Sequence, residues 1–466
     1  MQGRGKPLKW VFLAFLLILT PMLATLLKSK PKWLPLAALV LGVLPFVQGR
    51  FHLSANPIAW PFWQGTTKGI EFTLIDAISV AIIFATHRIK ASWPLKAALT
   101  IYLLGFSVST AMSSVKMADL FYGWTIVRTV IVFYALARAS KMHPKVPEAF
   151  LTGMIIGIAS QAVVTSIEFA GGARQAGGWF GHQNLLGMVT HFTVYPAFAL
   201  FLAGRAKKRT GFAVAACLLI AFTGGSRATI GLMGIGLFIT LILSCSLQIT
   251  RRKRVIAGAT FLASLIIAPV LYTAIARRSS EARQASTDER EKMMASAAMI
   301  LSDYPFGVGA NRFVSVSSVG GYRARSGVNW VSAAAPVHNS WYLVAAEMGW
   351  IGVTGFLAIV LAALATCFTA ARRARGTLLG DYSTGLVATV AMVALHSYQE
   401  WITMLSSVHQ IFGMSLGIAT ATLASSRLSA KARGRRPMLQ RADFEEARTL
   451  PRPPTSPAWD AVGARR

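Results

Sequence analysis

The chain has 466 residues, of which 54% are hydrophobic and 14% are charged, and its formal net charge is +30. A soluble globular protein of this composition would have too little polar surface, whereas a protein with many membrane-spanning helices needs this balance. The positive charge does not indicate nucleic-acid binding, because the Lys and Arg residues fall in short clusters between apolar runs.

Apolar runs of membrane-spanning length follow one another along the chain. The basic N-terminus and the run 10–27 resemble a signal peptide, but no convincing cleavage site follows, so we predict a retained anchor. Basic residues on both sides of 10–27 are incompatible with two full crossings at the front of the chain, which favours twelve true spans. The thirteen candidate runs are 10–27, 33–47, 70–86, 97–113, 121–139, 147–170, 184–203, 211–223, 228–248, 255–275, 338–370, 381–397 and 404–425.

The distribution of basic residues predicts the topology and four parts of an all-α polytopic membrane protein. Basic turns mark the cytoplasmic side, which leaves the polar loop 276–337 outside the cytoplasm. The parts are an N-terminal transmembrane bundle 1–275, this loop 276–337, C-terminal transmembrane helices 338–426 and a disordered, basic cytoplasmic tail 427–466. Cys217, Cys245 and Cys367 lie inside apolar runs, so we expect neither a disulfide framework nor a thiolate metal site.

The first outer segment with candidate functional side chains is Gly177–Gly187, which contains two aromatic and three polar residues among its glycines. Trp179 and His182 could form part of a sugar-binding platform, with Gln175 and Arg174 beside them. An interfacial aromatic belt with a helix cap explains the same residues equally well.

Arg227 lies in the outer turn of a tight apolar hairpin, within Thr223-Gly-Gly-Ser-Arg-Ala-Thr-Ile230. A charge at membrane depth is functional by default, and the neighbouring glycines would let phosphate oxygens approach the backbone. The alternative is that the side chain extends to the membrane surface without a further role.

The long loop contains a predicted amphipathic helix. Ser286-Thr-Asp-Glu289 has the pattern of a capping box, and apolar positions at helical spacing continue to Ser302, before Tyr304-Pro305 ends them. On this helix Arg290 shares a face with apolar residues, so a guanidinium would be held near headgroup level, where it suits a diphosphate. Alternatively, Arg290 pairs with Asp288, Glu291 or a phospholipid.

His338 opens the apolar run 338–370, directly after the polar loop. In its neutral form an imidazole there could act as a general base, and Asn339 could help to cap the helix. A purely structural hydrogen bond at the interface is the alternative. Glu347 is about half a turn out of phase with His338, so we interpret it as a packing or network residue. Gly349, Gly352 and Gly355 predict close helix packing.

Four fragments, in this order, resemble the superfamily of O-antigen ligases and O-antigen polymerases. They are Gly178-Trp-Phe-Gly-His-Gln-Asn-Leu-Leu-Gly187, Gly225-Ser-Arg-Ala228, Arg290 followed by Met299 to Gly309, and His338-Asn-Ser with Glu347-Met-Gly-Trp-Ile-Gly352. Each fragment alone is weakly specific, but together they span about 175 residues with the long loop correctly placed. The first 170 residues and the tail share only the general character of the family.

The resemblance implies a membrane glycosyltransferase, with a GT-C-like fold, in the bacterial inner membrane. Such an enzyme moves a glycan from undecaprenyl diphosphate to an acceptor hydroxyl on the periplasmic face, with inversion and without metal or cofactor. His338 would be the catalytic base, and Arg227, Arg290 and Arg174 would bind the diphosphate. Trp179, His182, Gln175 and Asn339 would contact the glycan or the acceptor.

The sequence leaves the acceptor open. Ligation to lipid A-core is our first hypothesis, polymerisation of O-antigen or exopolysaccharide is the second, and transfer to a protein hydroxyl is a third. A lipid-linked glycan flippase would need charges gathered in a central cavity, whereas Glu71, Asp76 and Glu168 are scattered in the sequence. The single late loop, with no internal repeat, also argues against a transporter, and a non-enzymatic scaffold would not explain three outer functional residues.

Overall fold

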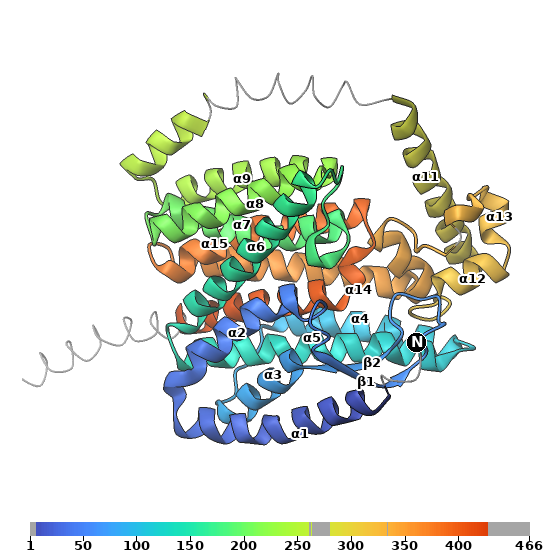
Figure 1. Ribbon diagram of the computed structural model, residues 1–466, viewed down its shortest axis with the longest axis horizontal. Helices are drawn as coiled ribbons and strands as arrows, with labels where there is room; N and C mark the ends of the chain where they lie inside the picture. Colours follow the sequence, from blue (N-terminus) through green and yellow to red (C-terminus); the bar gives the residue numbers. More distant parts are fainter. Residues whose placement is uncertain (1–5, 261, 263–279, 333, 427–466) are drawn as a thin grey trace, which may run out of the picture. The chain divides into compact units, whose positions relative to one another are not determined.

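The computed structural model describes residues 6–260, 262, 280–332 and 334–426. It divides into two units, Met1–Leu423 and Ala424–Arg466, and of the second only residues 424–426 are described. The described chain is almost entirely helical, which confirms the predicted all-α class, with one small hairpin as the exception (Figure 1). The predicted disordered tail 427–466 and most of the second half of the run 255–275 lie outside the described residues.

The helices of the first part follow the apolar runs closely. They are α1 (Lys6–Ser29), α2 (Leu34–Val47), α3 (Leu74–Ala85), α4 (Trp93–Met112), α5 (Lys116–Met142), α6 (Val146–Ala170), α7 (Gln183–Leu202), α8 (Lys207–Gly224) and α9 (Arg227–Leu247). The later helices are α11 (Ser280–Asp303), α12 (Phe313–Val319), α13 (Tyr322–Ser326), α14 (Ser340–Arg373), α15 (Leu378–Gln399) and residues 406–426. Short 3-10 helices are η1 (Pro31–Trp33), η2 (Gly178–Phe180), η3 (Trp330–Ser332) and η4 (Ile402–Met404).

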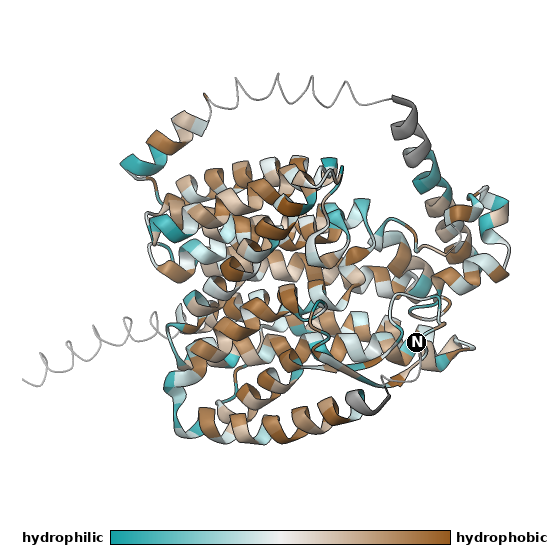
Figure 2. Cartoon of the chain, viewed as in Figure 1, coloured by the Kyte–Doolittle hydropathy of each residue, from teal (hydrophilic) through white to brown (hydrophobic). Residues whose placement is uncertain are grey.

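Eight of the described helices are long and apolar enough to cross a membrane, which identifies a multi-pass membrane protein; α2 and α3 are apolar but shorter. Hydrophobic residues cover the long helices, while hydrophilic residues concentrate at their ends and on α11 (Figure 2). The twelve spans and the side on which each loop lies stay predictions. Helix α7 is the most buried candidate span, and it packs against α8, α9 and α15.

The predicted span 70–86 is wrong in its first part. β1 (Ser54–Ala59) and β2 (Gly69–Thr73) form an antiparallel hairpin, and α3 begins only at Leu74. Thr73 and Asp76 make a reciprocal capping box, which fixes the helix start and satisfies backbone N–H groups there. Glu71 lies in the strand, where its side chain meets a buried arginine described below.

The predicted start of the loop helix is also wrong, because α11 begins at Ser280 and the Ser286–Glu289 segment lies inside it. Its end at Asp303, before Tyr304-Pro305, is as predicted. Met293, Ala297 and Ile300 are buried in a protein core that includes α14, so this face of α11 packs on protein. Arg290 lies beside that face.

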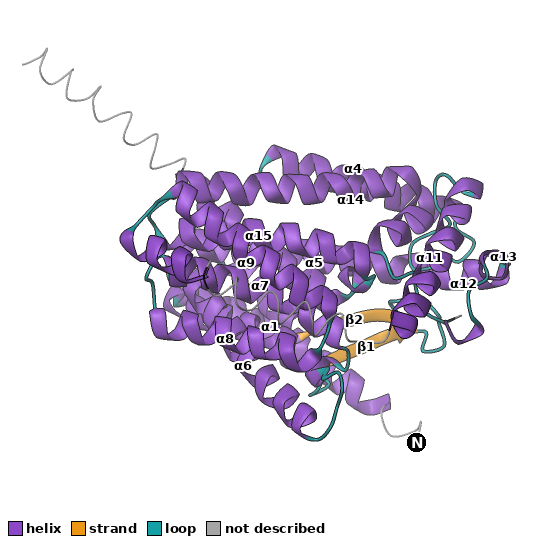
Figure 3. Ribbon diagram, turned by 90° about the horizontal axis from the view of Figure 1, so that it is seen from above, coloured by secondary structure: helices purple, strands orange, loops and turns teal. Residues whose placement is uncertain are grey.

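Helix α14 is interrupted at Gly349, whose φ of 66° and ψ of −166° are not helical. An L side chain rarely adopts this conformation, and a Cβ there would collide with the backbone of Pro305 and Phe306. The predicted close packing holds for the other two glycines, since Gly352 and Gly355 contact the backbone of α4. Figure 3 shows α4 and α14 side by side.

Glu347 is a network residue, as predicted. Its two carboxylate oxygens accept backbone hydrogen bonds from Asn311 and Phe313, at 2.8 and 2.9 Å. Asn311 has a φ of 64° and is fully buried. This contact fixes the segment after α11 onto the first half of α14 and so stabilises the part of the loop that leads back to His338.

Candidate active site

The centre of the site is the carboxylate of Glu400, which directly follows α15 and is 1% exposed. Its Oε2 lies 3.1 Å from Nδ1 of His338. Its Oε1 accepts hydrogen bonds from Nη2 of Arg290 at 2.9 Å and from Nδ2 of Asn184 at 2.5 Å. Two predicted site residues, His338 and Arg290, are therefore brought together by an acid that sequence reasoning missed.

The loop before α14 holds His338 in place. Pro336 and Val337 are buried, and the Oγ of Ser340 donates to the backbone oxygen of Glu400 at 2.8 Å. The side chain of His338 is 28% exposed. When Nδ1–H donates to Glu400, Nε2 is the nitrogen that can accept a proton.

Arg290 approaches Glu400 from α11. Its Nη1 also donates to the side-chain oxygen of Gln399 at 3.3 Å, and the guanidinium is 31% exposed. Among the described residues, Arg290 forms its ion pair with Glu400. A guanidinium has five N–H groups, so the two contacts leave donors for an anion.

The pKa of the Glu400 carboxyl is lowered. Burial by itself raises it, because a low-dielectric environment disfavours the charged form, but the hydrogen bond and charge of His338 and the charge of Arg290 outweigh this effect. Glu400 is thus an ionised, buried carboxylate. Such a group can fix the ring of a histidine and stabilise its charge when the other nitrogen takes up a proton.

Arg227 is the first residue of α9 and is exposed, while Ser226 before it accepts a hydrogen bond from the backbone of Thr229. It makes no hydrogen bond or ion pair within the part of the chain that the structure describes. Thr229 packs so tightly against Gly187 that no Cβ could be added there, which sets the start of α9 beside the start of α7. Asn184, one turn earlier on α7, is the partner of Glu400.

The segment around Gly177–Gly187 presents the remaining predicted residues. Arg174, Gln175 and His182 are exposed, and Gln175 accepts a hydrogen bond from Gln183 at 3.2 Å. The ring of Trp179 packs edge-on against Phe51, with 6.0 Å between the centroids. In the described part of the chain these side chains make no hydrogen bond or ion pair with Glu400, so they lie outside the ionic cluster.

Asn339 has the capping role that the sequence suggested. Its side-chain oxygen accepts from the backbone N–H groups of Trp341 and Tyr342, at 2.9 and 3.2 Å, and the residue is fully buried. The predicted contact of Asn339 with the glycan or the acceptor stays a prediction.

A series of hydrogen-bonded, buried side chains on α15 and α7 begins one turn before Glu400. His396, one turn earlier on α15, contacts His191 at 3.2 Å, and His191 contacts the hydroxyl of Tyr195 at 2.9 Å. That hydroxyl donates to the backbone oxygen of Leu232. His191 is thus a buried core residue whose two ring nitrogens both have partners.

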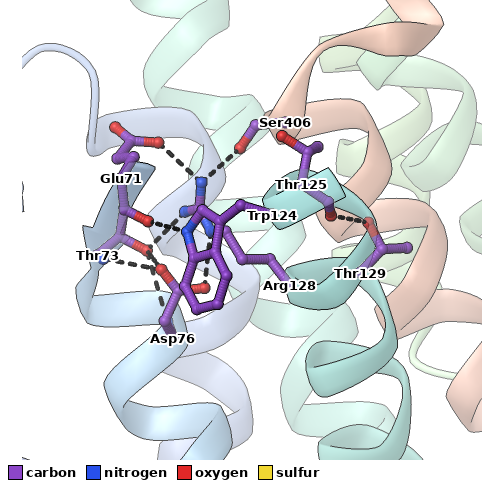
Figure 4. A network of polar contacts seen from close by, with 8 residues as sticks. All are labelled: Glu71, Thr73, Asp76, Trp124, Thr125, Arg128, Thr129 and Ser406. Carbon is purple, nitrogen blue, oxygen red and sulfur yellow. Dashed lines mark hydrogen bonds and ion pairs between the residues drawn. The ribbon is translucent and has the colours of Figure 1, made fainter. Parts of the chain in front are cut away.

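A second ionic cluster surrounds Arg128 of α5 (Figure 4). Its guanidinium is 2% exposed and donates to Glu71 and Asp76, both at 2.9 Å. It also donates to Thr73 and to Ser406, the first residue of the last helix. Glu71 and Asp76 therefore meet on one arginine, while Glu168 accepts from the backbone N–H of Gly178.

Glu400 was missed because no spacing links it to the other site residues. It lies 62 positions after His338 and 110 after Arg290 in the chain. The signal that could have found it is an acid in the turn after His396, in a chain with only 17 acidic residues. Such an acid has few alternative roles.

Comparison with known families identifies a domain within the chain. Residues 212–357 match a family model described as O-antigen ligase, and this range includes Arg227, Arg290 and His338 but ends before Glu400. No curated protein matches the chain. Over residues 212–357, the chain is therefore similar to the O-antigen ligase family.

Proposed function

We propose that this protein transfers a glycan from undecaprenyl diphosphate to an acceptor hydroxyl, with lipid A-core as the first acceptor. The O-antigen ligase domain supports the class of reaction. The observation that carries the mechanism is the contact of His338 and Arg290 with different oxygens of the buried Glu400. One carboxylate thereby holds a proton acceptor and an anion-binding group at fixed positions.

His338 is the general base. Its Nδ1 faces Glu400, Nε2 has no hydrogen-bond partner among the described residues, and 28% of the side chain is exposed. Nε2 removes the proton from the acceptor hydroxyl as the oxygen attacks the anomeric carbon. Glu400 keeps the ring in this tautomer and stabilises the imidazolium that forms.

The diphosphate is the leaving group. The new bond joins the acceptor oxygen to the anomeric carbon, and the bond from that carbon to the phosphate oxygen breaks with its electron pair going to the diphosphate. Attack on the face opposite the leaving group inverts the anomeric centre. Arg290 and Arg227 stabilise the growing charge, and Arg174 is a third, more remote candidate.

We place the site on the periplasmic face of the inner membrane. The charge pattern supports this orientation, since the turns on the side of Glu400 are poor in Lys and Arg and the opposite turns are rich in them. A preactivated lipid-linked donor also removes the need for ATP or a nucleotide sugar outside the cytoplasm. Trp179, His182 and Gln175 are proposed to contact the glycan at the approach to α7.

The test is glycan transfer in liposomes that contain the purified protein, an undecaprenyl diphosphate oligosaccharide and lipid A-core, without added metal or nucleotide. We expect the wild type to form the ligated product. His338→Ala and Glu400→Gln should lower the rate by roughly 10² or more, because a positioned general base contributes about 10²–10⁴. His87→Ala, in an exposed position after α3, is the matched control.

Each outcome separates one alternative. Lengthening of the donor glycan without ligation would show a polymerase, and transfer to an added protein hydroxyl would show a protein glycosylating enzyme. Full activity of His338→Ala would rule out the proposed base. Movement of the intact donor across the bilayer without any transfer would indicate a flippase.

A further inference from the structure

A groove of about 630 Å³ lies between the second half of α11 and the first turns of α14. Ala298, Leu301 and Pro305 form one wall, and Trp341, Tyr342 and Trp350 form most of the other. The mechanism above does not use this space. Its two walls belong to the segments that carry Arg290 and that follow His338.

The groove and Arg290 of the ionic cluster lie along one face of α11. On α11, Arg290, Met294, Ala298 and Leu301 are spaced by four, four and three residues, so they share one face. Between the cluster and the groove, the Sδ of Met294 accepts a hydrogen bond from Asn339 at 3.4 Å. A molecule bound at Arg290 would thus meet the groove directly beyond it.

The lining favours hydrocarbon over sugar. It is almost entirely apolar, and the indole N–H of Trp341 already donates to the backbone oxygen of Ala394 at 3.3 Å. Sugar hydroxyls placed here would lose hydrogen bonds to water without replacing them, whereas an alkyl or isoprenoid chain would lose none. Trp350 is 61% exposed, as is common for aromatic residues at a membrane interface.

The direction of the groove also fits an amphiphile. From His338 the chain enters α14, whose apolar length continues past the groove to the basic residues Arg372 and Arg373. A chain that leaves Arg290 along this helix moves from a charged cluster into the apolar part of a candidate membrane span. The charged end and the apolar end of the path therefore match those of a polyprenyl diphosphate.

We infer that this groove seats the hydrocarbon chain of the donor lipid next to its diphosphate, with the diphosphate at Arg290. The inference rests on the proposed function and adds the place where the lipid binds. It makes Leu301, Ala298 and the aromatic wall of α14 determinants of donor affinity. It also makes donor binding independent of the base His338.

The first test measures binding without catalysis. A photo-crosslinking amino acid is placed at Leu301 in the groove, or at Ala295, which is exposed on the same helix and does not line it. Glycan-free undecaprenyl diphosphate is added in liposomes, and crosslinked lipid is identified by mass spectrometry. We expect crosslinking at Leu301, also in the His338→Ala background, and little at Ala295.

The second test fills the groove. Ala298→Phe should raise the KM for the lipid-linked donor about tenfold, corresponding to about 1.4 kcal/mol, with little change in kcat. Ala295→Phe adds the same volume at an exposed position of the same helix, outside the groove, and should leave KM unchanged. Equal effects of the two variants would show a general disturbance of α11 and would contradict the inference.

Different results would overturn the groove assignment and the proposed glycan transfer. Crosslinking at Leu301 to phospholipid that undecaprenyl diphosphate does not displace would overturn the groove assignment, even if glycan transfer is observed. Specific crosslinking without glycan transfer by the wild type would keep the groove and defeat the proposed reaction. Equal crosslinking at Leu301 and Ala295 would also overturn the groove assignment.

Discussion

Asn184, at the start of α7, and Glu400, after α15, are 216 residues apart in the sequence and share a hydrogen bond of 2.5 Å. The bond connects the most buried candidate span to the ionic cluster of the site. Its acceptor is Oε1 of Glu400, which also accepts the hydrogen bond from Arg290. Asn184 therefore acts on the site through Glu400.

Exchanging this amide tests its role. Asn184→Ala should lower kcat/KM for glycan transfer by about 10- to 100-fold, since a hydrogen bond to a charged group contributes about 1.5–3 kcal/mol. Asn184→Asp is nearly isosteric but places a second negative charge against Glu400, so it should be more damaging than alanine. Steady-state kinetics of both variants provide the measurement. If aspartate were tolerated better than alanine, the electrostatic argument would be wrong.

Glu400 also predicts a pH dependence of stability. Its pKa in the folded protein is below the ordinary value of 4.5, so the ionised form stabilises the fold above that pH. This contribution is lost as the pH falls through the lowered pKa. The Tm of the wild type should exceed that of Glu400→Gln by a constant amount near neutral pH, and the difference should shrink below pH 4.5. Thermal unfolding in detergent measures it, and a difference that grows on acidification would contradict the assignment.

The cluster around Arg128 is predicted to be structural. Arg128→Met leaves two acids without their cation, and breaking a buried ion pair in this way costs about 3–5 kcal/mol. Arg373→Met, at an exposed arginine at the end of α14, is the control and should change stability little. The check is the Tm of both variants in the same detergent. Equal values would show that the cluster contributes no net stability.

The structural role of Gly349 can be tested by comparison with a glycine that has ordinary helical geometry. Gly349→Ala should destabilise the protein by roughly 1–3 kcal/mol, because its backbone conformation is unfavourable for alanine and its neighbours leave no space. Gly231→Ala in α9 meets nothing within 4 Å and should be neutral or stabilising by about 0.4–1 kcal/mol. Thermal unfolding of the pair measures the difference. Similar effects at both positions would contradict the structural role of the break.

Local properties of the sequence predicted most helices. The run 184–203 corresponds to α7 and the run 381–397 to α15, because hydropathy and turn residues are carried by the segment itself. The interruption of α14 could not be predicted in this way, since it depends on contact between Gly349 and the segment after α11. The hairpin at Glu71 likewise depends on a distant partner, Arg128.

The site residues also divide into those that the sequence could indicate and those that only the structure could show. His338, Arg290 and Arg227 stand out in the sequence because each is a polar residue at the edge of an apolar or amphipathic segment. Glu400 does not, because its importance comes only from the three chain segments that the fold brings to it. The sequence therefore indicated candidate side chains, while the structure was needed to show which of them share a partner.

The pairing of Arg290 with Glu400 changes how the site attracts an anion. With His338 neutral, the cluster of these three side chains has a net charge of zero, so Arg290 offers directed N–H groups more than long-range attraction. Arg227 has no ion-pair partner among the described residues, and its full charge extends into the solvent. Salt should therefore slow capture of the diphosphate mainly through Arg227, while the geometry at Arg290 stays largely insensitive to ionic strength.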